Sequence, residues 1–145
     1  MTEVRDVAAY ILGRAGRMTT MKLQKLCYYA QAWSLVWDER PLFPERIEAW
    51  ANGPVCPDLY YMHKGMFSIS PGDIDGDVDA IDKEGRETVD AVLDFYGSLD
   101  AYRLSELTHH ERPWMDARGD TPKGLSCSTE ITPAAMAEYY GSLTD

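Results

Sequence analysis

The sequence predicts a mainly α-helical protein that folds as one compact domain, residues 1–145, with about six or seven helices and at most a small β element. A chain of 145 residues and 16.4 kDa suits one ordinary core, so a second sizeable core is not expected. Hydrophobic residues make up 45% of the chain and charged residues 26%, a balance typical of globular proteins. Most segments repeat apolar residues at helical spacing and are separated by glycines, prolines and capping residues.

The first two helices are predicted in the N-terminal quarter of the chain. The first runs from Val4 to about Arg14 with Thr2 as its N-cap, and the second runs from a Thr19 or Thr20 cap to about Trp37. The second helix is apolar on two sides, with one stripe through Leu23, Leu26, Cys27, Ala30, Ser34 and Trp37 and another through Met21, Tyr28, Ala32 and Leu35. Such a helix is usually central to a fold, although one stripe could instead be reserved for a partner.

The middle of the chain predicts a short strand and two further helices. Residues 46–50 alternate apolar with charged side chains and could form the strand, whereas Gly53-Pro54 is expected to prevent regular structure in the turn that follows. Pro57 suits the first turn of a short helix that ends at Gly65. Asp82 can then cap a helix from Lys83 to about Gly97, whose acidic side faces outward.

The C-terminal third predicts three more helical segments. Ser98 or Asp100 starts a helix over residues 101–110, and Pro113 opens a short turn that stops at Gly119. Residues 119–128 have the composition of a loop. A final helix begins with Thr132 as N-cap and Pro133 at its first position, and it ends at Gly141.

The acidic charge of the chain is concentrated in residues 73–100. The whole chain carries a net charge of -10, and this stretch holds 10 acidic and 2 basic residues. The sign of the net charge argues against general binding to nucleic acids or anionic membranes, which needs dense Lys and Arg. The Asp-rich part, residues 73–82, does not match an EF-hand calcium loop, which needs a glycine at its sixth position. Counted from Asp73, Gly76 falls at position four, and counted from Asp77, position six is Asp82. A solvated connector or a short edge strand is expected there.

Cellular location is inferred from what the sequence lacks. No apolar run approaches the ~20 residues that span a bilayer, and the first residues lack the long apolar region of a signal peptide. The three cysteines, Cys27, Cys56 and Cys127, are too few and too scattered for a disulfide framework. A cytoplasmic protein without membrane partners is expected.

The one polar cluster that could support catalysis is formed by His109, His110 and Glu111. These residue types serve in acid–base chemistry and as metal ligands, so a small hydrolase is the competing function. Neighbouring side chains on a helix point about 100° apart, however, so the two histidines cannot both face one ion without a bend. A structural His109 packed beside Trp114 is preferred, and no catalytic residue, metal or cofactor is predicted.

Surplus aromatic residues point instead to partner binding. Tyr28-Tyr29, Tyr60-Tyr61 and Tyr139-Tyr140 occur on predicted helices, where one ring of each pair can enter the core while the other turns outward. Exposed Tyr residues often dominate interfaces, although a tyrosine at a core margin is equally common. The candidate partner-binding residues are Tyr28 and Leu35 on the second helix, Tyr60 and Tyr61 on the short helix, and the rigid Gly53-Pro54 between them.

Three segments of the sequence resemble a known family. KLQKLCYYAQAWSLVW, PLFPERIEAWANGPVCPDLYYMHKG and LSELTHHERPWMDAR occur in that order. Together they resemble the SocA-like, or Panacea, antitoxin domain over about residues 4–140. The points of match are Lys22 to Lys25, Gly53 to Val55, Thr108-His109 and Pro113-Trp114.

The resemblance implies a largely helical module that neutralises a toxin by direct binding. In at least one type, the module is an adaptor that delivers its toxin to the ClpXP protease. Many members carry an additional N-terminal DNA-binding region, but this chain starts only a few residues before the matched segment, so DNA binding is not expected.

We therefore expect a non-enzymatic antitoxin that blocks a cognate toxin, encoded by the adjacent gene, through direct protein–protein binding. Delivery of the toxin to a ClpXP-type protease is the alternative, and it is less favoured because no separate tail follows the last helix. The toxin should carry a basic or mixed patch facing residues 73–100.

Overall fold

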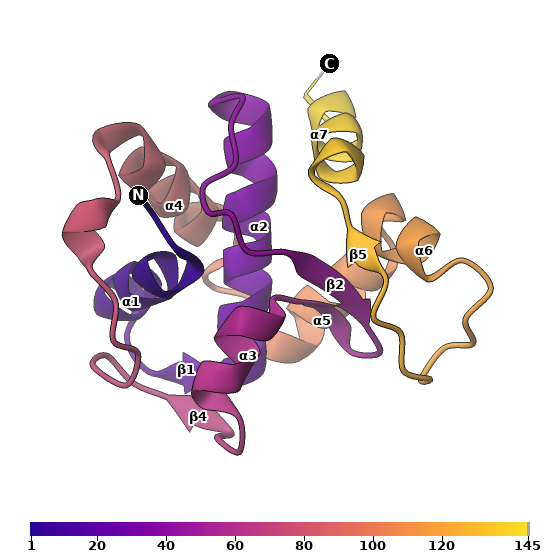
Figure 1. The fold of residues 1–145 in the computed structure, drawn as a ribbon, viewed down its shortest axis with the longest axis horizontal. Helices are drawn as coiled ribbons and strands as arrows, with labels where there is room; N and C mark the ends of the chain where they lie inside the picture. The colour runs from indigo at the N-terminus through magenta and orange to yellow at the C-terminus, as the bar shows by residue number, and fades with distance from the viewer. Residues whose placement is uncertain (145) are drawn as a thin grey trace.

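Helix α2 (Thr20–Trp37) is the element around which the rest of the chain packs in the computed structural model (Figure 1). The structure describes residues 1–144. Every residue of α2 from Leu23 to Ser34 is buried, so the central part of both apolar stripes belongs to the core, whereas Met21 and Trp37 at the two ends are exposed. The expectation of a central helix is confirmed, and this part of α2 leaves no exposed strip for a partner.

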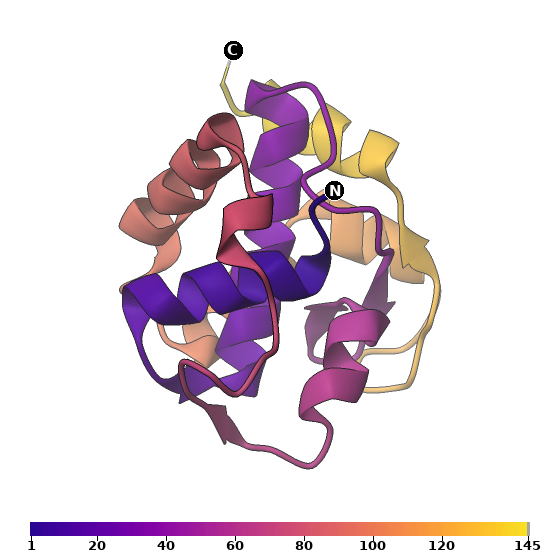
Figure 2. The same ribbon diagram turned by 60° about the vertical axis from the view of Figure 1, so that its left-hand side comes forward.

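Residues 1–144 form seven α-helices and two small sheets, which confirms the predicted mainly α fold. Helix α1 (Val4–Ala15) runs across α2, as Figure 2 shows, and α4 (Lys83–Tyr96) packs against both. Helices α5 (Ala101–His109) and α7 (Pro133–Ser142) also pack on α2. The short helix α3 (Pro57–His63) contacts α1 and α2, whereas α6 (Arg112–Arg118) contacts α5 and α7.

The helix caps follow the predictions from sequence closely. Side-chain oxygens of Thr19, Asp82, Asp100 and Thr132 accept hydrogen bonds from backbone N–H groups in the first turns of α2, α4, α5 and α7. The prediction was wrong for α1, where Glu3 rather than Thr2 is the N-cap. The Thr2 hydroxyl instead donates to the carbonyl oxygen of Ala80.

The larger sheet is antiparallel and has the strand order β3-β2-β5. Strand β2 (Ile47–Trp50) confirms the predicted strand. It is the central strand, and β5 (Glu130–Ile131) pairs with the edge of β2 opposite to β3. The expectation that Gly53-Pro54 prevents regular structure was wrong, because both residues belong to β3 (Gly53–Val55). Pro54 is tolerated there because β3 is an edge strand. A second sheet joins β1 (Met18–Thr19) to β4 (Ser68–Ile69).

The Asp-rich connector, residues 73–82, is a loop with one short 3₁₀ helix, η1 (Val78–Ala80), rather than an edge strand. Most of its Asp side chains are exposed, as expected, but Ile74 and Ile81 are buried and anchor the loop to the core. Three arginines, Arg14, Arg40 and Arg86, form ion pairs with acidic residues of the 73–100 stretch. No helix among residues 1–144 is long and apolar enough to cross a membrane.

Candidate binding pocket

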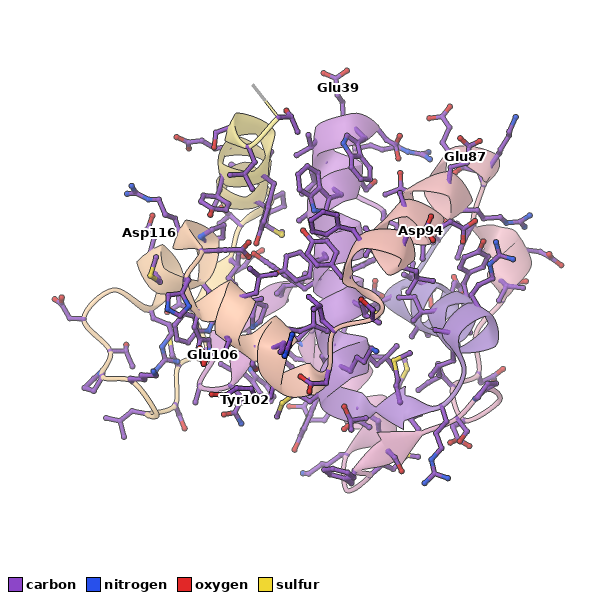
Figure 3. All side chains as sticks on the ribbon, turned by 180° about the vertical axis from the view of Figure 1, so that it is seen from behind. Glu39, Glu87, Asp94, Tyr102, Glu106 and Asp116 are labelled. Atoms are coloured by element: carbon purple, nitrogen blue, oxygen red, sulfur yellow. The ribbon has the colours of Figure 1, made fainter. Side chains whose placement is uncertain are left out.

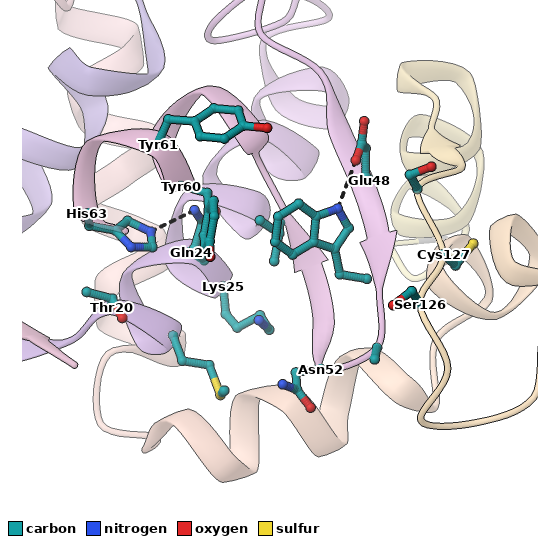
Figure 4. Close-up of a pocket in the computed structure, with 15 residues that line it drawn as sticks. Thr20, Gln24, Lys25, Glu48, Asn52, Tyr60, Tyr61, His63, Ser126 and Cys127 are labelled. Carbon is teal, nitrogen blue, oxygen red and sulfur yellow. Dashed lines mark hydrogen bonds between the residues drawn. The ribbon is translucent and has the colours of Figure 1, made fainter. Parts of the chain in front are cut away.

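A pocket of about 660 Å³ opens between the first turns of α2, the β2–β3 hairpin, α3 and the loop at residues 126–128 (Figure 4). Aromatic side chains form much of its wall, with Trp50 and Tyr60 in edge-to-face contact at 5.0 Å between ring centroids. This volume and this mixture of aromatic and polar walls are typical of ligand pockets, which measure about 300–1,000 Å³.

Gln24 connects the pocket to the backbone that precedes α3. Its side-chain oxygen accepts from the Cys56 N–H at 2.9 Å, and its side-chain nitrogen lies 3.2 Å from the Cys56 carbonyl oxygen and 3.0 Å from His63 Nε2. Because the amide nitrogen is the donor toward His63, that ring nitrogen accepts, which requires a neutral imidazole. Burial also lowers the pKa of His63, in agreement with the neutral form.

Lys25 is the one cationic side chain of the pocket lining, and it is only 1% exposed. No ion pair of Lys25 occurs within residues 1–144, although buried ammonium groups are normally paired. Its Nζ is not among the fully buried polar atoms without a partner, so it borders the open volume of the pocket. Burial alone lowers the pKa of Lys25 from 10.5 to about 7. The pocket therefore contains a buried amine that lacks a counter-ion.

Gly53 makes room for Lys25. A Cβ atom at this position would lie 2.5 Å from Lys25 Cε and 3.3 Å from its Nζ. Its φ angle of 121° also lies in a region that residues with a side chain rarely adopt. A residue with a side chain at position 53 would therefore displace the Lys25 side chain. From the sequence alone, Gly53 was predicted only as part of a rigid turn.

The acidic group of the pocket, Glu48, is already paired. Its Oε1 accepts from Trp50 Nε1 at 2.8 Å (Figure 4), and its Oε2 lies 3.1 Å from Arg46 Nε. These contacts hold the indole of Trp50 in the pocket wall. Both carboxylate oxygens of Glu48 are therefore engaged by other side chains, and Glu48 forms no ion pair with Lys25.

Arg118 holds the loop that forms the far wall of the pocket. It is buried, and its guanidinium donates to the carbonyl oxygens of Ala49, Pro122 and Leu125 at 2.7–3.0 Å. Ala49 lies in strand β2, whereas Pro122 and Leu125 lie in the loop itself. Since residues 126–128 line the pocket, the shape of this wall depends on a side chain from α6.

Replacing Arg118 by methionine is expected to lower the free energy of unfolding by about 2 kcal/mol, because three backbone carbonyls lose a charged donor. Amide hydrogen exchange in residues 124–128 should become faster, since the loop loses its anchor. Chemical unfolding and hydrogen exchange measure the two effects. Arg112→Met on the same helix is the control, because Arg112 is exposed and, among residues 1–144, forms an ion pair with Asp116 alone. Equal exchange in both variants would contradict the anchoring role.

The structure brings four of the six predicted partner-binding residues to this region. Gly53 and Pro54 lie in β3, and Tyr60 and Tyr61 line the pocket from α3. Tyr61 is 69% exposed, so it is open to a partner. Whether these residues bind a partner stays a prediction.

The structure does not place Tyr28 and Leu35 with the other four. Tyr28 is 1% exposed and its hydroxyl lies 3.0 Å from that of Tyr140, whereas Leu35 is partly buried against the core. The expectation that one ring of each tyrosine pair turns outward was wrong for Tyr28-Tyr29, because neighbours cover α2 on all sides and both rings are buried. It holds for Tyr139-Tyr140, of which Tyr140 is buried and Tyr139 only partly buried. For Tyr60-Tyr61, Tyr61 is exposed as expected, but Tyr60 is half-buried in the pocket wall rather than in the core.

His109, His110 and Glu111 do not converge on one point. His109 stacks on Trp114 at 4.0 Å between ring centroids, which confirms the predicted contact, and His110 Nδ1 bonds to the carbonyl oxygen of Glu106. The two histidines border a small pocket of about 220 Å³ that Glu111 does not line. Glu111 is buried on another side, and no group of three potential metal ligands occurs within residues 1–144.

Sequence reasoning missed Gln24, Lys25 and Trp50 as residues of the pocket. Lys25 is not one of the apolar residues at helical spacing on α2, so the sequence pattern predicts an exposed side chain. A signal was present in the lack of any acidic residue at i±3 or i±4 from Lys25, which leaves it without a partner on its own helix. The crossing of β3 over α2, which buries it, is a tertiary contact and has no local signature.

The chain matches the model of a known family. A family model described as the antitoxin SocA-like, Panacea domain matches residues 23–115. The match begins inside α2 and ends in α6, and it contains Lys25, Trp50, both pocket tyrosines and His63. Neither the curated proteins nor the solved structures gave a significant match.

Proposed function

Since the chain belongs to the SocA-like Panacea antitoxin domain family, we propose that it neutralises a cognate protein toxin by binding it directly. The family match over residues 23–115 is the observation that carries this proposal. The toxin is proposed to be the product of the adjacent gene. The role is one of binding rather than catalysis, in keeping with the separation of His109 and Glu111 in the fold.

We propose that the toxin docks on the face that carries the pocket. Four apolar side chains around it are exposed and form what we term the rim patch: Met21, Tyr61, Met66 and Phe67, at 37%, 69%, 38% and 82%. Met21 and Tyr61 line the pocket itself, and the backbone of the other two lies beside Thr20 at its edge. Exposed apolar patches with aromatic anchors are typical of protein interfaces.

The acidic residues of the 73–100 stretch are proposed to speed association with the toxin rather than to form the interface. The connector, residues 73–82, holds five Asp and no basic residue, whereas α4 holds four acidic and two basic residues. Helix α4 lies on the face opposite to α3, as Figures 1 and 3 together show. Figure 3 labels Glu87 and Asp94 on that face. A toxin with a basic or mixed surface would therefore be attracted at long range by residues 73–100 and would associate faster at low salt.

Blocking and delivery to a protease differ in one observable. A stoichiometric blocker relieves the growth arrest caused by its toxin in cells that lack ClpXP, whereas an adaptor does not. We propose blocking, which needs only the buried interface that the rim patch and pocket can supply. Co-expression of the chain with the neighbouring gene in cells with and without ClpXP tests the proposal. A toxic neighbour whose arrest the chain fails to relieve in both strains would refute an antitoxin role for this pair.

Tyr61→Ala is expected to weaken toxin binding by about 2 kcal/mol or more, since truncation of an exposed aromatic anchor removes a hot spot. The melting temperature should hardly change, because Tyr61 contributes little to the core. Calorimetric titration and thermal unfolding give the two values. The control is Phe95→Ala, which removes a ring that is 73% exposed on α4, on the far face. Normal binding by the Tyr61 variant would remove this residue from the docking site.

A further inference from the structure

The pocket contains a feature that toxin docking does not require, which is the buried amine of Lys25. An ammonium group taken out of water without an acceptor is costly, and burial of a charge is normally offset by a paired group. The other polar groups of the pocket have partners, since Glu48 is bound to Trp50 and Arg46, and His63 to Gln24. Among the lysine, arginine and carboxylate side chains of the pocket lining within residues 1–144, Lys25 is the one without an ion pair, and Figure 4 shows its side chain extending along the pocket.

We propose that the pocket is a binding site for a small organic carboxylate with a flat apolar body, whose carboxylate group pairs with Lys25. The aromatic rings of Trp50, Tyr60 and Tyr61 supply the surface for the apolar body. The volume of about 660 Å³ accommodates a molecule of this size. The site shares Tyr61 with the rim patch, but its charged group, Lys25, lies inside the pocket, so ligand binding is tested on the chain alone, without the toxin.

The charges of the pocket favour one negative charge on the ligand. Its lining contains a single cationic side chain and a carboxylate that already has a partner. A phosphate monoester, with nearly two charges, would need further cationic groups that the lining lacks. Neutral donors, the Asn52 amide and the Ser126 and Ser128 hydroxyls, are available for the second carboxylate oxygen.

The protonation state of the amine agrees with this assignment. The titratable groups around Lys25 are Glu48, Tyr60, Tyr61, His63 and Cys127 of the pocket lining, together with His109 on α5. Burial lowers the pKa of Lys25 to about 7, and an entering anion would raise it again by favouring the ammonium form. Binding above pH 7 is therefore accompanied by uptake of a proton.

The test compares three carboxylates, benzoate, 2-naphthoate and indole-3-acetate, with the primary amide of each. Calorimetric titrations at pH 6.5 use the unchanged chain, Lys25→Met and the control Lys83→Met, which removes an exposed lysine of α4. At least one carboxylate should bind the chain and the control tenfold or more tightly than its amide, and Lys25→Met should abolish that preference.

A second measurement needs no variant. At pH 8.5, titrations of the unchanged chain in two buffers with different heats of ionisation should reveal uptake of a proton with the preferred carboxylate. The proposal is overturned if no carboxylate of the three is preferred over its amide, if the preference survives in Lys25→Met, or if binding at pH 8.5 takes up no proton.

Discussion

Replacing Lys25 by methionine is expected to stabilise the folded protein, and the gain should be largest at or below pH 7. The pKa of Lys25 is about 7 in the folded chain and 10.5 when the side chain is in water. Between these values the unfolded chain holds the extra proton, so the stability of the unchanged protein rises with pH. Below pH 7 both states are charged, and the folded protein bears the whole cost of the buried ammonium.

The size of this pH dependence follows from the two pKa values of Lys25. One unit of pKa difference corresponds to about 1.4 kcal/mol, so the advantage of Lys25→Met should shrink by about 2.5 kcal/mol between pH 6 and pH 9. Denaturant unfolding at both pH values gives the difference in free energy of unfolding between the variant and the unchanged chain. The effects of other titrating groups are the same in both proteins and cancel in this difference. Lys83→Met should show no such trend. A variant that is less stable at pH 6 would mean that Lys25 has a structural partner.

Replacing Glu111 by alanine is expected to lower the free energy of unfolding by about 3 to 5 kcal/mol. Its Oε1 accepts from the hydroxyls of Tyr29 and Tyr140, each at 2.7 Å, in the core between α2, α7 and the α5–α6 junction. Truncation removes a buried side chain and leaves two buried hydroxyls without their acceptor. Burial raises the pKa of Glu111, and the two hydroxyl bonds offset part of that rise.

Two variants control this result. Glu111→Gln keeps a side-chain oxygen as acceptor and should lose much less stability. Glu106→Ala removes an exposed carboxylate of α5 and should change the free energy of unfolding by less than about 0.5 kcal/mol. Chemical unfolding measures all three. A loss below 1 kcal/mol in Glu111→Ala would show that the tyrosine hydroxyls find other acceptors.

The helices were predictable from the sequence because their signals are local. Apolar spacing and capping side chains mark α2, α4, α5 and α7, and the capping bonds from Thr19 and Thr132 lie where the sequence places them. The short strands were harder, because β1, β4 and β5 have two residues each and form only when distant segments meet. The strand at Gly53-Pro54 was missed because its local composition favours a turn, and pairing with β2 overrides that preference.

The candidate site was only partly predictable, for the same reason. Tyr60 and Tyr61 could be selected because aromatic pairs on a short helix leave one ring outside. Tyr28 could not be separated from them, since only the packing of α7 against α2 shows that its ring is covered. Lys25 is buried by β3, and no property of its own helix reveals that contact.

The most direct test of the account is amide hydrogen exchange of the chain alone and in complex with the toxin from the adjacent gene. We expect slower exchange on binding in α3, in residues 66–67 and in residues 126–128, which surround the pocket and the rim patch. Helix α4, on the far face, should exchange equally in both states. Protection confined to α4, with α3 and residues 126–128 unchanged, would contradict the proposal that the toxin docks on the pocket face.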